Sequence, residues 1–185
     1  NMFSDIQQLI WLFPIAFILH DFEEILLFEP WLKKNSGLIM SRIPNKAPAF
    51  LAKQMPIILG KTTTQFAFPI FLIFVLTCIS AFLAAEFQSY PIFLVASSLF
   101  FLHGFMHVGQ AIFLRRYIPA LITSVLIAIP YGVILFWKLL EAGVVSLWGL
   151  AIYFGVAIVL AVPFIVGMHI LGEAFYQRVM KILIG

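Results

Sequence analysis

The chain has 185 residues, of which 63% are hydrophobic and only 10% are charged, and its formal net charge is +3. Soluble globular proteins are closer to half apolar and a quarter charged, so the composition excludes an ordinary water-soluble fold. It predicts instead an all-α polytopic membrane protein in contact with the lipid bilayer. The small positive charge then reflects membrane topology and gives no indication of nucleic-acid binding.

Long apolar runs predict about five transmembrane helices in a single domain, residues 1–185. A helix that crosses the bilayer needs about 20 mostly apolar residues, and the runs lack the alternation that is typical of barrel strands. The expected spans cover residues 6–28, 64–85, 91–114, 118–140 and 146–175.

The first span carries the polar sequence His-Asp-Phe-Glu-Glu at residues 20–24. At 100° per residue, His20, Glu23 and Glu24 share one helical face, whereas Asp21 points away from it. An ionisable side chain inside the bilayer costs about 2.5–3.5 kcal/mol on insertion scales. The cluster therefore needs a compensating partner, which can be an ion pair, a proton or a metal ion.

A segment of mixed basic and apolar residues, 31–63, joins the first two spans and contains three prolines. This pattern predicts short amphipathic pieces in the membrane interface. A linker that lies along the membrane is favoured over a mobile lid for the site.

The remaining spans differ sharply in their polar content. Spans two and four carry no matching His or Glu, whereas span three places His103, His107 and Gln110 on one face. Span five does the same with His169, Glu173 and Tyr176 and has Pro163 as its expected kink point. Small residues such as Gly104 and Gly172 are expected to bring spans three and five together.

The basic residues predict that the N-terminus faces outward and the C-terminus faces the cytoplasm. Six Lys and Arg residues lie between spans one and two, Arg115 and Arg116 lie between spans three and four, and two more follow span five. The other side holds mainly acidic residues, and Lys and Arg mark cytoplasmic loops.

The histidines of the three spans are predicted to lie at similar depths in the membrane. His20 precedes Lys33 by 13 residues, His103 precedes Arg115 by 12, and His169 precedes Arg178 by 9. At 1.5 Å per residue, these positions on three parallel helices differ by about one helical turn. We therefore expect one polar site in the cytoplasmic half of the bilayer.

Imidazole and carboxylate groups without a thiolate favour one or two ions of zinc or iron. The candidate metal-binding residues are His20, Glu23, Glu24, His103, His107, His169 and Glu173. Glu23 and Glu24 are also the candidate catalytic proton carriers. Asp21, Gln110 and Tyr176 are candidates to orient the metal-binding residues by hydrogen bonds.

These residues favour a membrane-embedded metalloenzyme that hydrolyses a lipid-like or otherwise hydrophobic substrate. A di-iron oxidase or hydroxylase of a hydrophobic substrate and a proton- or metal-coupled transporter are the alternatives. A structural or proton-relay network without metal also remains open, as does a homo-oligomer.

The segment from His20 to Glu24, with His103, His107 and His169 in later spans, resembles the HXXEE-domain family of bacterial membrane proteins. The resemblance implies a multi-pass protein of the bacterial inner membrane. It implies no particular reaction, because that family is functionally uncharacterised.

Overall fold

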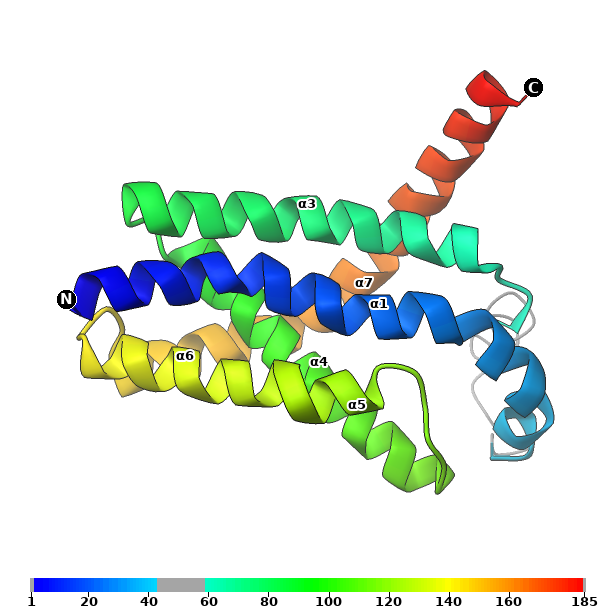
Figure 1. Ribbon diagram of the computed structural model, residues 1–185, viewed down its shortest axis with the longest axis horizontal. Coiled ribbons are helices and arrows are strands. Elements are labelled where there is room, and N and C mark those ends of the chain that lie inside the picture. The colour runs from blue at the N-terminus through cyan, green and yellow to red at the C-terminus, as the bar shows by residue number, and fades with distance from the viewer. Residues whose placement is uncertain (1, 43–58, 185) are drawn as a thin grey trace.

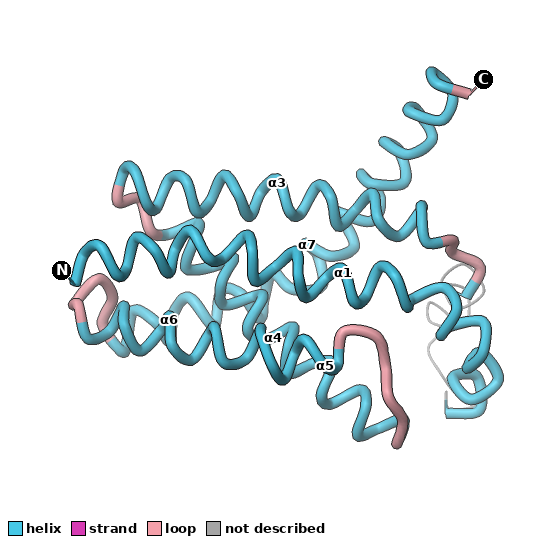
Figure 2. Tube along the Cα trace, viewed as in Figure 1, coloured by secondary structure: helices cyan, strands magenta, loops and turns pink. Residues whose placement is uncertain are grey.

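The computed structural model describes residues 2–42 and 59–184, which form a bundle of helices joined by short loops (Figures 1 and 2). In chain order the elements are α1 (Met2–Arg42), α3 (Thr63–Phe87), α4 (Pro91–Leu114), α5 (Leu121–Thr123), a π-helical turn (Ser124–Ala128), α6 (Ile129–Glu141) and α7 (Leu147–Leu183). No β-strand occurs in these two ranges.

Four helical segments of the described chain are long and apolar enough to cross a membrane: Thr63–Phe87, Pro91–Leu114, Leu121–Glu141 and Leu147–Leu183. The first two coincide with the expected spans to within two residues. The third begins at Leu121 rather than at residue 118. The last ends at Leu183 rather than at residue 175 and contains Pro163, the expected kink point, within one helix. The expected count of about five therefore depends on α1, which carries the charged residues of the first span.

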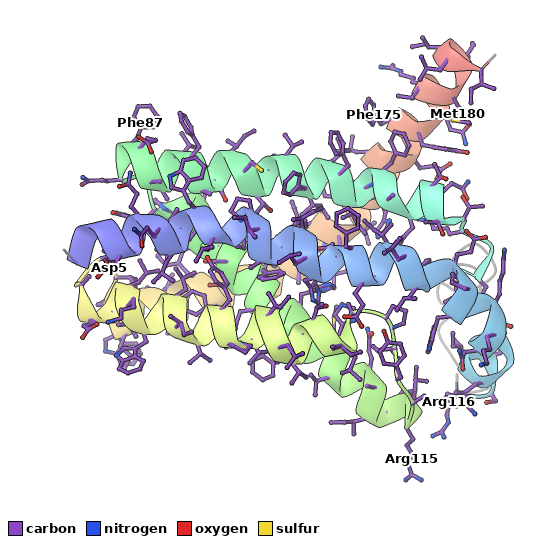
Figure 3. All side chains as sticks on the ribbon, viewed as in Figure 1. Asp5, Phe87, Arg115, Arg116, Phe175 and Met180 are labelled. Carbon is purple, nitrogen blue, oxygen red and sulfur yellow. The ribbon has the colours of Figure 1, made fainter. Side chains whose placement is uncertain are left out.

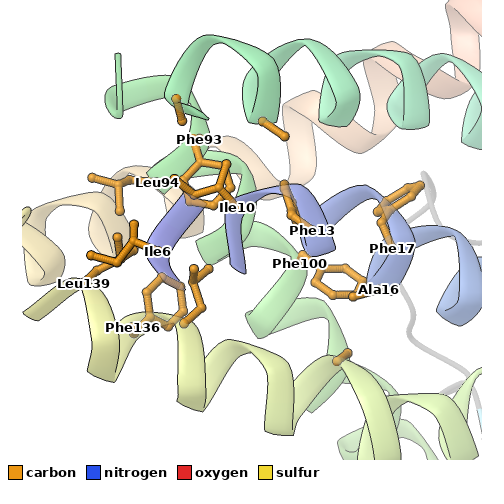
Figure 4. Packing of buried hydrophobic residues seen from close by; sticks show 14 of the residues in the cluster. Ile6, Ile10, Phe13, Ala16, Phe17, Phe93, Leu94, Phe100, Phe136 and Leu139 are labelled. Atoms are coloured by element: carbon orange, nitrogen blue, oxygen red, sulfur yellow. The ribbon is translucent and has the colours of Figure 1, made fainter. Parts of the chain in front are cut away.

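Helix α1 lies at the centre of the bundle, between α3 and α6 (Figure 1). Its buried stripe consists of Ile6, Ile10, Phe13, Phe17 and His20, which recur at intervals of three or four residues. The apolar members pack against Phe93 and Phe100 of α4 and against side chains of α6 (Figure 4). His20 thus occupies the next inward-facing position of a core helix.

The first helix does not end at residue 28, as the sequence predicted, but continues through Pro30 to Arg42. Its last turns bend away from the bundle (Figure 1), as expected where proline removes a backbone hydrogen bond. The helical part of the expected interfacial segment is thus an extension of α1. Residues 43–58 of that segment lie outside the described residues, and its last residue, Thr63, begins α3.

Glu29 connects this extension to α3. Its carboxylate accepts hydrogen bonds from the Lys33 ammonium at 2.5 Å and from the amide and hydroxyl of Thr63 at 2.6 and 2.9 Å. The contact with Lys33, together with those from Thr63, lowers the pKa of Glu29 to about 2. The carboxylate therefore stays ionised at neutral pH and holds the start of α3 against α1.

Charged residues separate along the bundle axis. Asp5 and the end of α3 at Phe87 lie at one end, whereas Arg115 and Arg116 lie at the other (Figure 3). The charge asymmetry on which the predicted orientation rests is therefore also an asymmetry between the two ends of the bundle.

Helices α3 and α7 cross in direct contact at Gly172. A Cβ atom at this position would lie 2.6 Å from the backbone nitrogen and 2.7 Å from the Cα of Pro69. Gly104 packs instead on Ala128 and Ile129, so the expected role of these glycines in joining spans three and five is wrong. Close approach without a side chain is a common way to pack membrane helices.

Replacing Gly172 with Ala is expected to destabilise the protein by about 1–3 kcal/mol, because the methyl group would have to displace the Pro69 backbone. Thermal unfolding in detergent would measure the effect. Gly167→Ala is the matched control on the same helix, since nothing lies within 4 Å of its added Cβ. Equal unfolding temperatures for the two variants would contradict this packing.

Candidate metal centre

Three histidines from two helices meet inside the bundle. His20 of α1 is fully buried and His107 of α4 is 3% exposed. The ring of His20 lies 5.4 Å from that of His103 and 5.2 Å from that of His107, and the two α4 rings are 4.3 Å apart. The i, i+4 spacing of His103 and His107 places both on the face of α4 that packs on α1.

Glu24 completes this group because it lies one helical turn after His20. The Nε2 atoms of His103 and His107 are 2.9 Å apart. Oε2 of Glu24 lies 3.8 Å from the first and 3.9 Å from the second. Two ligand atoms of a tetrahedral zinc ion are about 3.3 Å apart when each bond is about 2.0–2.1 Å. The triangle of donor atoms therefore has the dimensions of one face of a metal site.

Two sets of donor atoms fall within 4.8 Å of one another: His20, His103 and His107 form one, and Asp21, Glu24 and His103 form the other. Both share His103, so the described residues could hold one ion or two neighbouring ions. The predicted meeting of His20, His103, His107 and Glu24 is thus present in the fold.

Unpaired polar atoms in the interior also fit a cation. Nε2 of His20 and Oδ2 of Asp21 are buried and have no hydrogen-bond partner among the described residues. A buried polar atom left unsatisfied costs about 1–3 kcal/mol. A metal ion bound by Nε2 of His20 would remove that cost for the imidazole, and Oδ2 of Asp21 would remain free to accept a proton.

Glu23 has a different environment from Glu24. Its carboxylate accepts hydrogen bonds from the Tyr117 hydroxyl at 2.5 Å and from the amide and hydroxyl of Thr123 at 2.8 and 2.6 Å. Burial and contact with Glu23 raise the pKa of Tyr117, which remains a donor at neutral pH. Adjacent residues on a helix differ by 100° in direction, so Glu23 faces α5 while Glu24 faces α4.

Thr123 links Glu23 to His20. Its Oγ1 lies 3.2 Å from Nδ1 of His20 and 2.6 Å from Oε2 of Glu23. The single hydroxyl proton goes to the carboxylate, so the oxygen accepts the Nδ1–H of His20. This arrangement leaves Nε2 of His20 without a proton, in the tautomer that binds a metal ion.

Besides His169, four of the predicted site residues lie apart from the two sets. Glu23 is directed toward α5, Glu173 accepts a hydrogen bond from Gln177 at 2.9 Å, Gln110 is exposed, and Tyr176 packs on Phe68. Glu173 and Tyr176 follow the crossing at Gly172, after which α7 leaves the bundle (Figure 1). Asp21, which was expected to point away, instead lies with Glu24 and His103.

His169 of α7 lies near the group without joining either set. Its Nδ1 is 3.2 Å from the Nζ of Lys61, and its ring lies 6.0 Å from that of Phe66. Burial lowers the pKa of Lys61, although Glu173 acts in the opposite direction. Sequence reasoning missed Lys61 because it is one of several basic residues in the segment before α3.

A cavity of about 830 Å³ opens beside the group, between α1, α3, α4 and α7. Asp21, Glu24, His103 and His169 contribute to its wall, and most of its other lining residues are apolar. Volumes of this size are typical of small-molecule sites. The polar cluster is thus accessible from a space that suits a hydrophobic molecule.

Comparison with known proteins identifies a family whose function is unknown. A family model described as "Protein of unknown function with HXXEE motif" matches residues 11–135, a range that includes His20, Glu23, Glu24, His103 and His107. No curated protein and no solved structure matched the chain. Because the matched range covers more than half of the sequence, this chain belongs to the HXXEE family.

Proposed function

We propose that this protein is a membrane-embedded metalloenzyme that hydrolyses a lipid-like substrate. The observation that carries the proposal is the convergence of three imidazoles and a carboxylate, of which His103 and Glu24 reach the wall of an apolar cavity. The proposed setting is the bacterial inner membrane, with α1 as a fifth span and the site in its cytoplasmic half.

In the proposed site His20, His103, His107 and Glu24 hold one zinc or iron ion. Such an ion would act as a Lewis acid on a carbonyl oxygen of the substrate. Asp21 is the proposed proton acceptor for the attacking water, because it faces the cavity and its Oδ2 has no partner among the described residues. Glu23, an earlier candidate for this role, is occupied by Tyr117 and Thr123.

Hydrolysis requires no reactant other than the substrate and water. The hydroxyl of the water adds to the acyl carbon as the bond to the leaving group breaks, and the remaining proton passes through Asp21 to the departing oxygen or nitrogen. The carboxylic acid product then releases its own proton to the medium. The apolar cavity walls limit the entry of other water and position the substrate beside the carboxylate.

A site with two metal ions that oxidises a hydrophobic substrate is the second candidate. It is supported by the set of Asp21, Glu24 and His103, which adds two carboxylates next to the imidazoles. Mixed carboxylate and histidine ligation is the pattern of di-iron helical bundles.

A transporter is less well supported than an enzyme. The reason lies in the hydrogen bonds of the half of the bundle opposite the site. The hydroxyls of Thr77, Ser80 and Ser97 each donate to a carbonyl of their own helix. A path for protons or ions needs polar groups that face one another across the membrane.

Elemental analysis of the protein purified in detergent tests the proposal. We expect about one equivalent of zinc for the hydrolase, and about two of iron for the oxidase. Reconstitution with zinc or iron after chelation controls for loss during purification. Less than about a tenth of an equivalent, with no uptake on reconstitution, would contradict a metalloenzyme of either kind.

Asp21→Asn separates binding from catalysis. This variant is expected to keep its metal and to lose at least about 100-fold in hydrolysis of a bacterial polar lipid extract, as measured by release of free fatty acid. Unchanged release with normal metal content would show that another group accepts the proton.

A further inference from the structure

The cavity is elongated and follows the axes of three helices. Residues of α7 line it from Ile152 to His169, and residues of α4 line it from Pro91 to Met106. At 1.5 Å per residue, the wall formed by α7 is about 25 Å long. The apolar part of the cavity thus extends through most of the hydrocarbon core, which is about 30 Å thick.

The cavity is narrow relative to its length. A volume of about 830 Å³ spread over about 25 Å gives a mean cross-section of roughly 33 Å². A helix of about 10 Å diameter has a cross-section of roughly 80 Å². An extended hydrocarbon chain fits a cavity of this length and volume.

The cavity opens toward lipid along its apolar length. Several of its large lining side chains are partly exposed, including Leu76 at 44%, Ile92 at 58% and Ile152 at 65%. In a membrane these side chains meet acyl chains rather than water. A hydrophobic chain can therefore enter sideways from the bilayer and does not have to cross an aqueous phase.

A positive charge lies at the end of the cavity that is lined by His169. The ammonium of Lys61 approaches His169, which belongs to the cavity wall, and no described carboxylate lies within 4.0 Å of its Nζ. Lysine near an imidazole is well suited to a phosphate or carboxylate group. The cavity is thus apolar over most of its length and has an ammonium group against His169, which lines the wall together with Asp21, Glu24 and His103.

We propose that this cavity binds a single-chain amphiphile with an anionic headgroup, whose chain lies between α3, α4 and α7 and whose phosphate or carboxylate contacts Lys61. That this amphiphile is the substrate rests on the proposed hydrolase function. Its binding depends only on the cavity and on Lys61.

Photo-crosslinking in nanodiscs tests the binding. The probes are a lysophosphatidic acid with a diazirine at the end of its chain, a fatty acid with the same label, and a lysophosphatidylcholine and a two-chain phosphatidic acid as comparisons. We expect the first two to label peptides of α4 and α7 that line the cavity and to exceed the comparison lipids about tenfold, and the stronger of the two identifies the headgroup as phosphate or carboxylate.

Two variants make the result specific to the cavity. Ala161→Phe fills the chain region and is expected to reduce labelling about tenfold, whereas Val159→Phe, at a 75% exposed position of the same helix, should leave it unchanged. Lys61→Ala is expected to abolish the preference for anionic headgroups. Equal labelling by one- and two-chain lipids, or normal labelling of Ala161→Phe, would overturn the proposal.

Metal content is measured on the same samples. Specific labelling in protein that binds no metal would support the amphiphile site and contradict only the metalloenzyme. Metal binding with no labelling of cavity peptides by either anionic single-chain probe would overturn the amphiphile site and leave the metal centre standing.

Discussion

A His103→Ala protein is expected to lose at least about 100-fold in metal affinity while it still inserts and folds, because His103 belongs to both sets of converging donor atoms. Removing it leaves Glu24 and His107 without a common partner on the cavity side. Elemental analysis and competition with a chelator would measure the loss, and circular dichroism would confirm the helical fold.

His169→Ala is the matched control for this prediction. The sequence placed His169 among the metal-binding residues, but in the fold it contacts Lys61 and lies outside both sets. It should therefore retain metal. Equal losses from the two variants would show that α7 contributes a ligand and that the site is larger than the group around His103.

Thr123→Val should weaken metal binding by about 10- to 100-fold without removing any atom that contacts the ion. The change keeps the size of the side chain and deletes the hydroxyl between His20 and Glu23. His20 then loses the acceptor that fixes its tautomer and ring orientation. A chelator competition measurement of the metal Kd would detect the change.

Ser124→Ala provides the neighbouring control. The Ser124 hydroxyl is buried and has no hydrogen-bond partner in the described part of the chain, so its removal leaves the histidines unaffected. We expect a normal metal Kd and unchanged or slightly higher stability. An unaltered Kd in Thr123→Val would instead show that packing alone orients His20.

The spacing of the family motif follows from these contacts. His20 and Glu24 are four residues apart, so both face α4 and its two histidines. Glu23 lies on a neighbouring face and reaches Thr123, which in turn contacts His20. The two adjacent glutamates of the motif thus serve different helices, one beside the imidazoles and the other at the start of α5.

The sequence could predict which helical faces carry polar groups but not which helices they meet. His20, His103 and His107 were assignable because periodicity and depth in the membrane both point to one location. Glu23 was not, because choosing between α4 and α5 as its neighbour requires the packing of the bundle. Thr123 gave no signal, since a hydroxyl in an apolar helix commonly bonds its own backbone.

Two helix lengths also escaped prediction for physical reasons. Proline weakens a helix by removing one hydrogen bond, but flanking turns can continue it, and α1 passes through Pro30 to Arg42 instead of ending at residue 28. Helix α7 ends at Leu183 instead of residue 175. The site residues of α7 after Gly172 were misplaced because the direction of α7 depends on its contact with Pro69.

The π-helical turn at Ser124–Ala128 adds one residue to the helical path between Thr123 and the core-facing side of α6. One extra residue rotates everything before it by about 100° relative to everything after it. Leu135 and Leu139 can therefore keep their contacts in the bundle while Thr123 faces His20. A regular α-helix of the same sequence could present only one of these two surfaces correctly, so this widened turn allows a single segment to serve both the scaffold and the chemistry.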